Sequence, residues 1–333
     1  MTETTLAPPT GEEIREARLR IGGIAVRTPL LNLPPRPGEP EIWLKIETLQ
    51  PIGSFKIRGA ANAMALAPRE QLAKGVITAS AGNMAQGVAW CAREAGLPCT
   101  VVVPDNAPRA KLDAVEALGA QIIPLPFERW WKVLVDRRYE HAEGFFVHPV
   151  SDAAVIAGNG TIGLEILDDL PHVASVLVPY GGGGLSCGIA SAIRAAGSFA
   201  STFACEVATA APFAASLVAG APSAIDHRAS FVDGIGGRSL LEEMWPLAST
   251  LLAGTFVVTL EEIADAIRAL VSRMRTVAEG AGAAGVAAAF SGRAALGPGG
   301  VSVPLPPGPI VCVVSGGNID LTKLAVILEG RLP

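Results

Sequence analysis

Apolar runs of strand length alternate with longer amphipathic stretches in the first half of the chain. The pattern from Gly75 to Leu125 predicts strands at 75–79, 99–103 and 121–125 and helices at 85–95 and 107–118. The runs have the length of buried strands, and the stretches between them carry apolar residues at helical spacing. This alternation is typical of βαβ units, which place their strands in a parallel sheet.

The same unit recurs in the second half. The pattern predicts a strand at 175–178, a glycine turn at 181–184, a helix at 185–196 and a further strand at 202–205. A late apolar run, Ile310–Val314, suits a strand that is buried on both faces. We therefore expect an α/β protein with two lobes, each a mostly parallel open sheet flanked by helices.

Three other segments have a clear periodicity. Glu12–Arg20 has helical spacing, and 41–47 alternates apolar with polar residues like a half-buried strand. Thr259 with Glu262 three residues later predicts the capped start of a helix that runs to about Ala278.

The composition narrows the class of partner. The 333 residues are 50% hydrophobic and 17% charged, which indicates a well-buried globular protein. The net charge is −5 and no block of Lys or Arg occurs, so neither nucleic acid nor an anionic membrane is expected as the main partner. A small molecule is the better expectation.

Cysteine usage and the N-terminal sequence predict a cytoplasmic protein. The five cysteines lack the spacing of zinc ligands and favour buried thiols in a reducing compartment. The segment 1–18 has acidic residues and Pro8-Pro9 where a signal peptide would be basic and then apolar. The uncharged stretches 172–193 and 207–225 are too rich in Gly, Ala, Ser and Pro to predict membrane spans.

Lys56 is the first candidate for chemistry. It lies between Phe55 and Ile57 at the start of an Ala-rich helical run, where lost hydration would lower its pKa and free the amine as a nucleophile. From these residues alone, a solvated surface lysine is the commoner alternative.

Two turns between a strand and a helix could bind anions. The turn Ser80–Asn83 offers free backbone N–H groups for a substrate carboxylate, although an ordinary Ser/Asn-capped turn explains it as well. The four glycines Gly181–Gly184 favour a phosphate cradle over a merely structural turn. A dinucleotide site remains a weaker alternative, with Glu206 as its acidic residue.

A third turn follows the strand expected at 310–314. The hydroxyl of Ser315 could hydrogen-bond a ring nitrogen held at the strand ends. Glu279 precedes the small residues 280–284, which would let a helix approach a cofactor closely or simply pack tightly.

Taken together, these motifs resemble one enzyme family. Ser54-Phe55-Lys56-Ile57-Arg58-Gly59-Ala60, Ser80-Ala81-Gly82-Asn83, Gly181–Gly184 and Ser315-Gly316-Gly317-Asn318 resemble, in this order, the pyridoxal-phosphate enzymes of the threonine/serine dehydratase and serine racemase family, which have the tryptophan-synthase-β fold. Val155–Glu165 also looks like a segment of that family, with Asn159 where glutamine is usual. The resemblance covers roughly Thr28 to Asn318.

The resemblance implies a role for each motif. Lys56 would bind the cofactor as an imine and act as the catalytic base. The implied cofactor-binding residues are Phe55, Lys56, Asn83, Gly181, Gly182, Gly183, Gly184, Leu185 and Ser315. The substrate carboxylate would be held by Ser80, Ala81, Gly82 and Asn83. The reaction would remove water from a threonine- or serine-like amino acid and release a 2-oxo acid and ammonia.

It also implies where the lobes divide. Residues 1–50 and 147–333 would form a large cofactor-binding lobe and 51–146 a small mobile lobe, with the cofactor in the cleft between them. Small apolar faces suggest a homodimer.

Several departures from the family pattern bear on the activity. Ala81 stands where serine racemases usually have a second serine, which favours dehydration over racemisation, and Met84 replaces a usual histidine. Glu206 and the carbonyl of Ala210 match two ligands of the family's cation site, but Pro212 replaces the second carboxylate, so no metal is expected.

Three alternatives stay open. Tyr180, Arg129 and Trp130-Trp131 could shape a pocket for a bulkier or acidic substrate such as a 3-hydroxyaspartate, or they could simply pack between the lobes. Another β-elimination, β-replacement or racemisation enzyme of the same fold is the nearest rival. A catalytically idle amino-acid-binding protein is the rival of another class.

Overall fold

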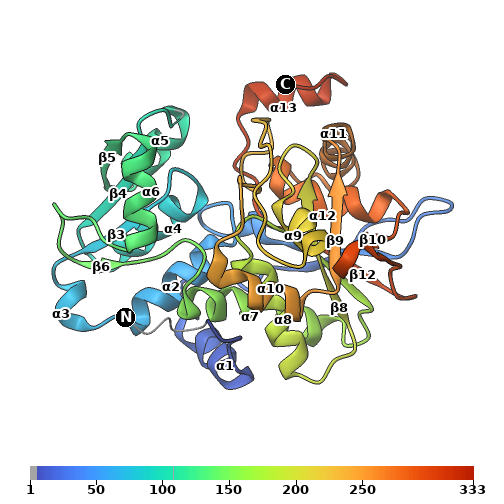
Figure 1. Cartoon of the computed structure of the whole chain (residues 1–333), viewed down its shortest axis with the longest axis horizontal. Coiled ribbons are helices and arrows are strands. Elements are labelled where there is room, and N and C mark those ends of the chain that lie inside the picture. Colours follow the sequence, from blue (N-terminus) through green and yellow to red (C-terminus); the bar gives the residue numbers. More distant parts are fainter. Residues whose placement is uncertain (1–5, 108) are drawn as a thin grey trace.

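Two β-sheets organise the chain, one in each half of the molecule (Figure 1). A computed structural model describes residues 6–107 and 109–333. Met1–Thr5, which begin the segment without a signal-peptide pattern, and Pro108, in the helix expected at 107–118, lie outside the described residues.

The larger sheet has eight strands in the order β1-β2-β12-β7-β8-β9-β10-β11. Its central strands, from β2 to β9, pair in parallel, and the others pair antiparallel at the two edges. The strands are β1 (Leu30–Asn32), β2 (Ile42–Ile46), β7 (Ser175–Pro179), β8 (Ser201–Val207), β9 (Gly254–Val258), β10 (Ala295–Leu296), β11 (Ser302–Val303) and β12 (Ile310–Val314).

The smaller sheet has four strands in the order β5-β4-β3-β6, all parallel. These strands are β3 (Val76–Ala79), β4 (Cys99–Pro104), β5 (Gln121–Leu125) and β6 (Phe145–Phe146). Its helices are α4 (Asn83–Glu94), α5 (Arg109–Glu116) and α6 (Phe127–Asp136). The βαβ pattern read from 75–125 is confirmed, with boundaries that differ by a few residues.

The remaining helices surround the larger sheet and the junction between the sheets (Figure 1). They are α1 (Gly11–Arg20), α2 (Lys56–Leu66), α3 (Arg69–Leu72), α7 (Ala153–Asp169), α8 (Gly184–Ala195), α9 (Pro212–Ala219), α10 (Trp245–Leu251), α11 (Leu260–Ala269), α12 (Gly280–Phe290) and α13 (Leu321–Leu328). No helix in the described part of the chain has the length and hydropathy needed to cross a bilayer.

The expected α/β architecture of two mostly parallel sheets is therefore confirmed. The division of the strands follows the expected lobes, since β3–β6 fall within 51–146 and the other strands of the described chain lie outside it. The exact lobe boundaries and the mobility of the smaller lobe remain predictions.

The expectation for 41–47 was wrong in one respect. β2 is buried on both faces because it pairs with β1 on one side and β12 on the other, so its alternation does not mark a solvated face. Lys45, read as a surface residue of that strand, is fully buried.

The helix expected to reach Ala278 ends earlier. The capping box of Thr259 and Glu262 is confirmed, but α11 ends at Ala269 and one π-helical turn carries the chain to Met274. Arg275 then adopts a left-handed backbone conformation with φ 55°, which terminates the helix.

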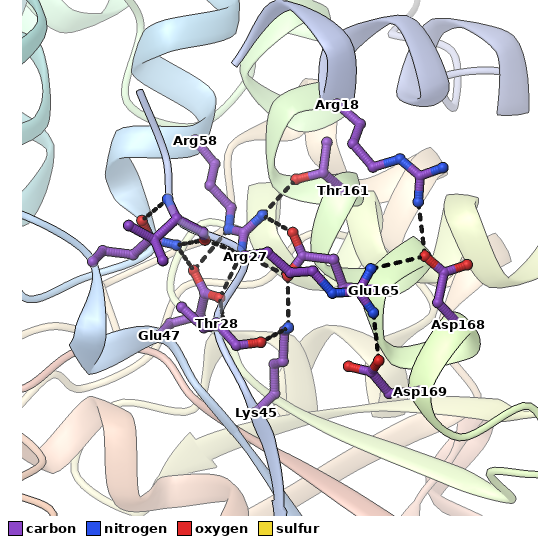
Figure 2. Close-up of polar contacts among 12 residues, drawn as sticks. Arg18, Arg27, Thr28, Lys45, Glu47, Arg58, Thr161, Glu165, Asp168 and Asp169 are labelled. Carbon is purple, nitrogen blue, oxygen red and sulfur yellow. Dashed lines mark hydrogen bonds and ion pairs between the residues drawn. The ribbon is translucent and has the colours of Figure 1, made fainter. Parts of the chain in front are cut away.

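Four buried charges fix the start of α2 on the larger lobe (Figure 2). The Arg58 guanidinium donates to Glu47 at 2.8 Å and to Glu165 of α7 at 2.6 Å. Lys45 donates to the other oxygen of Glu165 at 2.6 Å. The two cations and two carboxylates balance one another, and none of the four side chains is more than 5% exposed. Because Arg58 lies two residues after Lys56, this network also fixes the backbone of that lysine.

Candidate active site

A cavity of about 460 Å³ is lined by residues from both lobes. It brings together every residue that the sequence nominated for cofactor or carboxylate binding. These are Phe55, Lys56, Ser80, Ala81, Gly82, Asn83, Gly181, Gly182, Gly183, Gly184, Leu185 and Ser315. Residues far apart in the chain therefore meet around one cavity.

Lys56 is the first residue of α2 and is half-buried where it lines the cavity. Its ammonium nitrogen Nζ donates a hydrogen bond to the carbonyl of Pro149 at 2.9 Å and lies 5.2 Å from the centre of the Phe55 ring. Loss of hydration lowers the pKa of the Lys56 amine to about 8, with the Glu279 carboxylate acting in the opposite direction. The surface-lysine alternative is therefore wrong.

The glycine turn connects β7 to α8 and leaves no room for side chains. A Cβ atom at Gly182 would lie 2.4 Å from a methyl group of Val150, and one at Gly184 would lie 2.9 Å from the Val150 carbonyl. Gly183 has φ +93°, which favours glycine, and its place at the start of α8 leaves that helix end without a side-chain cap from the described residues. The free N–H groups at this end of α8 suit a phosphate.

The turn Ser80–Asn83 connects β3 to α4 at the same cavity. The Ser80 hydroxyl accepts from the Gly82 amide at 3.3 Å, and no side chain in the described part of the chain caps α4. The Asn83 side chain instead bonds to Glu279 and Asn318. The Ser/Asn-capped alternative is thus wrong, and the uncapped end of α4 suits a carboxylate.

Ser315 follows β12 and is 3% exposed. Its carbonyl accepts from the Phe55 amide at 3.0 Å, and Gly316 pairs with Ser54 in a β-bridge. The end of β12 is thereby joined to the segment that carries Lys56.

A family model described as "Pyridoxal-phosphate dependent enzyme" matches residues 22–316, most of the chain. The chain belongs to this family. The cavity fits its cofactor, because a partly dehydrated lysine and a side-chain-free phosphate cradle line the same space. Pyridoxal phosphate is therefore the cofactor of this protein.

Known relatives of this enzyme cover nearly its whole length. It is 42% identical over 293 residues to an L-threonine ammonia-lyase of Geobacter sulfurreducens, an alignment that spans 87% of this chain and 70% of the relative. Among solved structures, maize serine racemase superposes with a TM-score of 0.85 and 32% identity over 97% of this chain and 98% of its own. A threonine deaminase of T.th. gives 0.82 and 32% over 94% and 99%. With these relatives, the protein is a pyridoxal-phosphate-dependent lyase.

Glu206 has a structural role at another place. Its carboxylate accepts from the amides of Phe213 and Ala214 at 2.8 and 2.9 Å and from the Thr255 hydroxyl at 2.9 Å, so it caps α9. Neither Glu206 nor Ala210 lines the cavity, which removes the acidic residue that the dinucleotide alternative required. Within residues 6–107 and 109–333 no cluster of His, Cys, Asp and Glu is arranged to hold a metal ion. Metal independence stays a prediction.

Of the aromatic residues considered for the pocket, Trp130 lines the cavity. Tyr180 is fully buried and stacks on Phe213 with ring centres 4.7 Å apart, whereas Trp131 and Arg129 are exposed. Tyr180 therefore packs in the core of the larger lobe, as the packing alternative expected.

Three charged residues of the cavity had no assigned role from the sequence. Glu279 accepts from the Asn83 side chain at 2.8 Å, and Lys111 of α5 lies 2.8 Å from Asp233 across the two lobes. Asn83 and Glu279 are 196 residues apart, so no local pattern could pair them. The only signal was the run of small residues after Glu279.

Proposed function

We propose that this enzyme is an L-threonine ammonia-lyase, which converts threonine to 2-oxobutanoate and ammonia and also accepts serine. The single observation that carries the proposal is the meeting of Lys56, the glycine cradle and the carboxylate turn in one cavity. The name of the 42% identical relative supports the choice of reaction, and the threonine deaminase of similar structure supports the fit of such a substrate.

The residues of the cavity divide the binding between them. When bound, pyridoxal phosphate supplies an electron sink for bond breaking at the substrate's α-carbon. Gly181–Gly184 and the amide of Leu185 would hold its phosphate, Asn83 its 3-oxygen and Ser315 its ring nitrogen, with Phe55 beside the ring. A neutral hydroxyl at Ser315 suits elimination better than transamination.

Lys56 would carry the cofactor and then move the proton. Its pKa of about 8 leaves a useful fraction of free amine near neutral pH, which an ordinary lysine would not have. Once the substrate amine has taken its place on the cofactor, the freed Lys56 amine would remove the α-proton. Water lost from the β-carbon returns in hydrolysis, so the net products are the 2-oxo acid and ammonia.

The charges in the cavity favour a neutral side chain over an acidic one. Lys111 lines the cavity, and Asp233 already neutralises it at 2.8 Å. A second substrate carboxylate would therefore meet Asp233 and Glu279, and the described lining residues offer it no cation beyond Lys111 and Lys56. Ala81 has no hydroxyl to return a proton on the opposite face, which favours elimination over racemisation.

The remaining proposals concern the setting. The five cysteines are buried and unpaired, which supports a reducing, cytoplasmic location. We keep the homodimer as a proposal that the mass of the protein in solution can test.

Product analysis tests the proposed function. Purified protein loaded with pyridoxal phosphate is incubated separately with L-threonine, L-serine and 3-hydroxyaspartate, with and without a thiol acceptor. We expect equal amounts of 2-oxobutanoate and ammonia from threonine, pyruvate from serine, and little turnover of 3-hydroxyaspartate. Lys56→Ala should lose all of these activities.

A different product would contradict the proposal. Rapid interconversion of L- and D-serine with little pyruvate would indicate a racemase, and a thioether product would indicate β-replacement. A faster reaction with 3-hydroxyaspartate than with threonine would overturn the charge argument from Lys111 and Asp233.

A further inference from the structure

The side chain of Asn83 is held from both sides by residues of the other lobe. Asn318 donates from Nδ2 to the Asn83 oxygen Oδ1 at 2.8 Å, and Asn83 donates from Nδ2 to Glu279 Oε1 at 2.8 Å. Asn83 begins α4 beside the smaller sheet, whereas Glu279 and Asn318 flank α12 and β12 of the larger one. These bonds therefore join the two lobes at the cavity.

The chain of bonds has one direction. Asn318 also donates from Nδ2 to the carbonyl of Ile52 at 2.9 Å, and a backbone carbonyl can only accept. This fixes the Asn318 amide, which must then present N–H to the oxygen of Asn83. The Asn83 amide is fixed in turn, with one N–H on Glu279 and its second N–H left over.

Glu279 is in an unusual position for a buried carboxylate. It is the N-cap residue of α12 and 7% exposed, yet its side chain does not cap that helix. It turns instead toward Asn83, past Gly316, where a Cβ atom would lie 2.6 Å from Oε1. Its backbone N–H donates to the Gly316 carbonyl at 3.0 Å, so the residue is fixed beside Ser315.

The other charges near Glu279 leave Asn83 as its hydrogen-bond partner. Asp233 repels the Glu279 carboxylate, while Lys111 and Lys56 attract it, and Lys111 is already paired with Asp233. Lys56 donates to the Pro149 carbonyl. Asn83 supplies the one hydrogen bond recorded to the Glu279 side chain among the described residues.

We propose that Glu279 is a positioning residue that, together with Asn318, fixes the Asn83 amide so that its remaining N–H meets the bound cofactor. Glu279 acts only through Asn83 and does not itself contact the cofactor. The inference rests on the cofactor role proposed for Asn83, but not on the identity of the substrate.

Cofactor uptake by the apoprotein tests this role without any substrate. Pyridoxal phosphate is titrated into Asn83→Ala, Glu279→Ala, Glu279→Gln and the double variant N83A/E279A, and the visible absorbance of bound cofactor gives the Kd. We expect N83A and E279A each to weaken binding about tenfold. The double variant should be no weaker than N83A, and E279Q should be near wild type because its amide oxygen still accepts from Asn83.

The absorbance maximum of the bound cofactor adds a readout that stability alone does not move. It should shift in the same direction in N83A and E279A and stay unchanged in Glu261→Gln, an exposed residue of α11. If E279A does not fold, as judged by thermal unfolding of the apoprotein, Asn318→Ala replaces it in the same cycle, because it frees Asn83 from the other side.

Three results would overturn the proposal. They are additive losses in the double variant, an E279Q protein as weak as E279A, and an N83A protein that binds the cofactor normally. Failure of the proposed function is separate, since it would appear as absent 2-oxobutanoate from threonine while these Kd values stay as expected.

Discussion

At the scale of single residues, the environment of Lys56 is more informative than the lysine itself. Its amine is partly dehydrated, donates to the neutral Pro149 carbonyl, and has the indirect influence of Glu279 to stabilise its charge. Burial lowers the pKa of the nearby His148 side chain to about 3, so His148 is neutral and accepts from the amides of Val150 and Ser151. Lys56 is therefore the better candidate for proton transfer.

The pKa of Lys56 predicts how cofactor uptake depends on pH. Only the neutral amine attacks an aldehyde, so the uptake rate of the apoprotein should rise with pH, with a midpoint near the pKa of about 8 and not near the ordinary 10.5. Stopped-flow absorbance after mixing with pyridoxal phosphate measures it. A rate that is still rising steeply above a pH of about 9.5 would contradict this pKa.

At the scale of elements, α2 is held by buried charges and the two anion-binding helices are left uncapped. Arg58 and Lys45 neutralise Glu47 and Glu165 away from bulk water, so removal of one partner leaves a buried charge without compensation (Figure 2). In contrast, α4 and α8 receive no side-chain cap from residues 6–107 and 109–333 where they line the cavity. The elements are thus rigid at Lys56 and open where anions bind.

Two carboxylates of α7 offer a matched test of the buried network. Glu165→Gln should lower the free energy of unfolding by roughly 3–5 kcal/mol, because Lys45 and Arg58 lose a shared buried partner. Asp168→Asn breaks only exposed pairs with Arg18 and Arg27 and should cost under about 1 kcal/mol. Equilibrium unfolding in urea measures both. Equal losses in the two variants would show that the buried network does not stabilise the fold.

At the scale of the whole molecule, the sequence predicted the parts of the fold that depend on local pattern. The strand Ile310–Val314 and the βαβ units follow from periodicity, and the glycine turn follows from four residues that need no partner to be recognised. The burial of Lys45 could not be predicted, because its strand becomes central only when β12 pairs with it. Glu279 and Asn83 meet only after both lobes have formed. What local sequence misses is therefore pairing over long distances.

The central claim is that the lysine beside the glycine cradle carries the cofactor. Borohydride reduction of the holoenzyme, followed by peptide mapping with mass spectrometry, tests it most directly, because reduction fixes the cofactor to its lysine. We predict one modified lysine per chain, Lys56, and no modification of the Lys56→Ala protein. Modification of the buried Lys45 or of the cavity residue Lys111 in place of Lys56 would contradict the account.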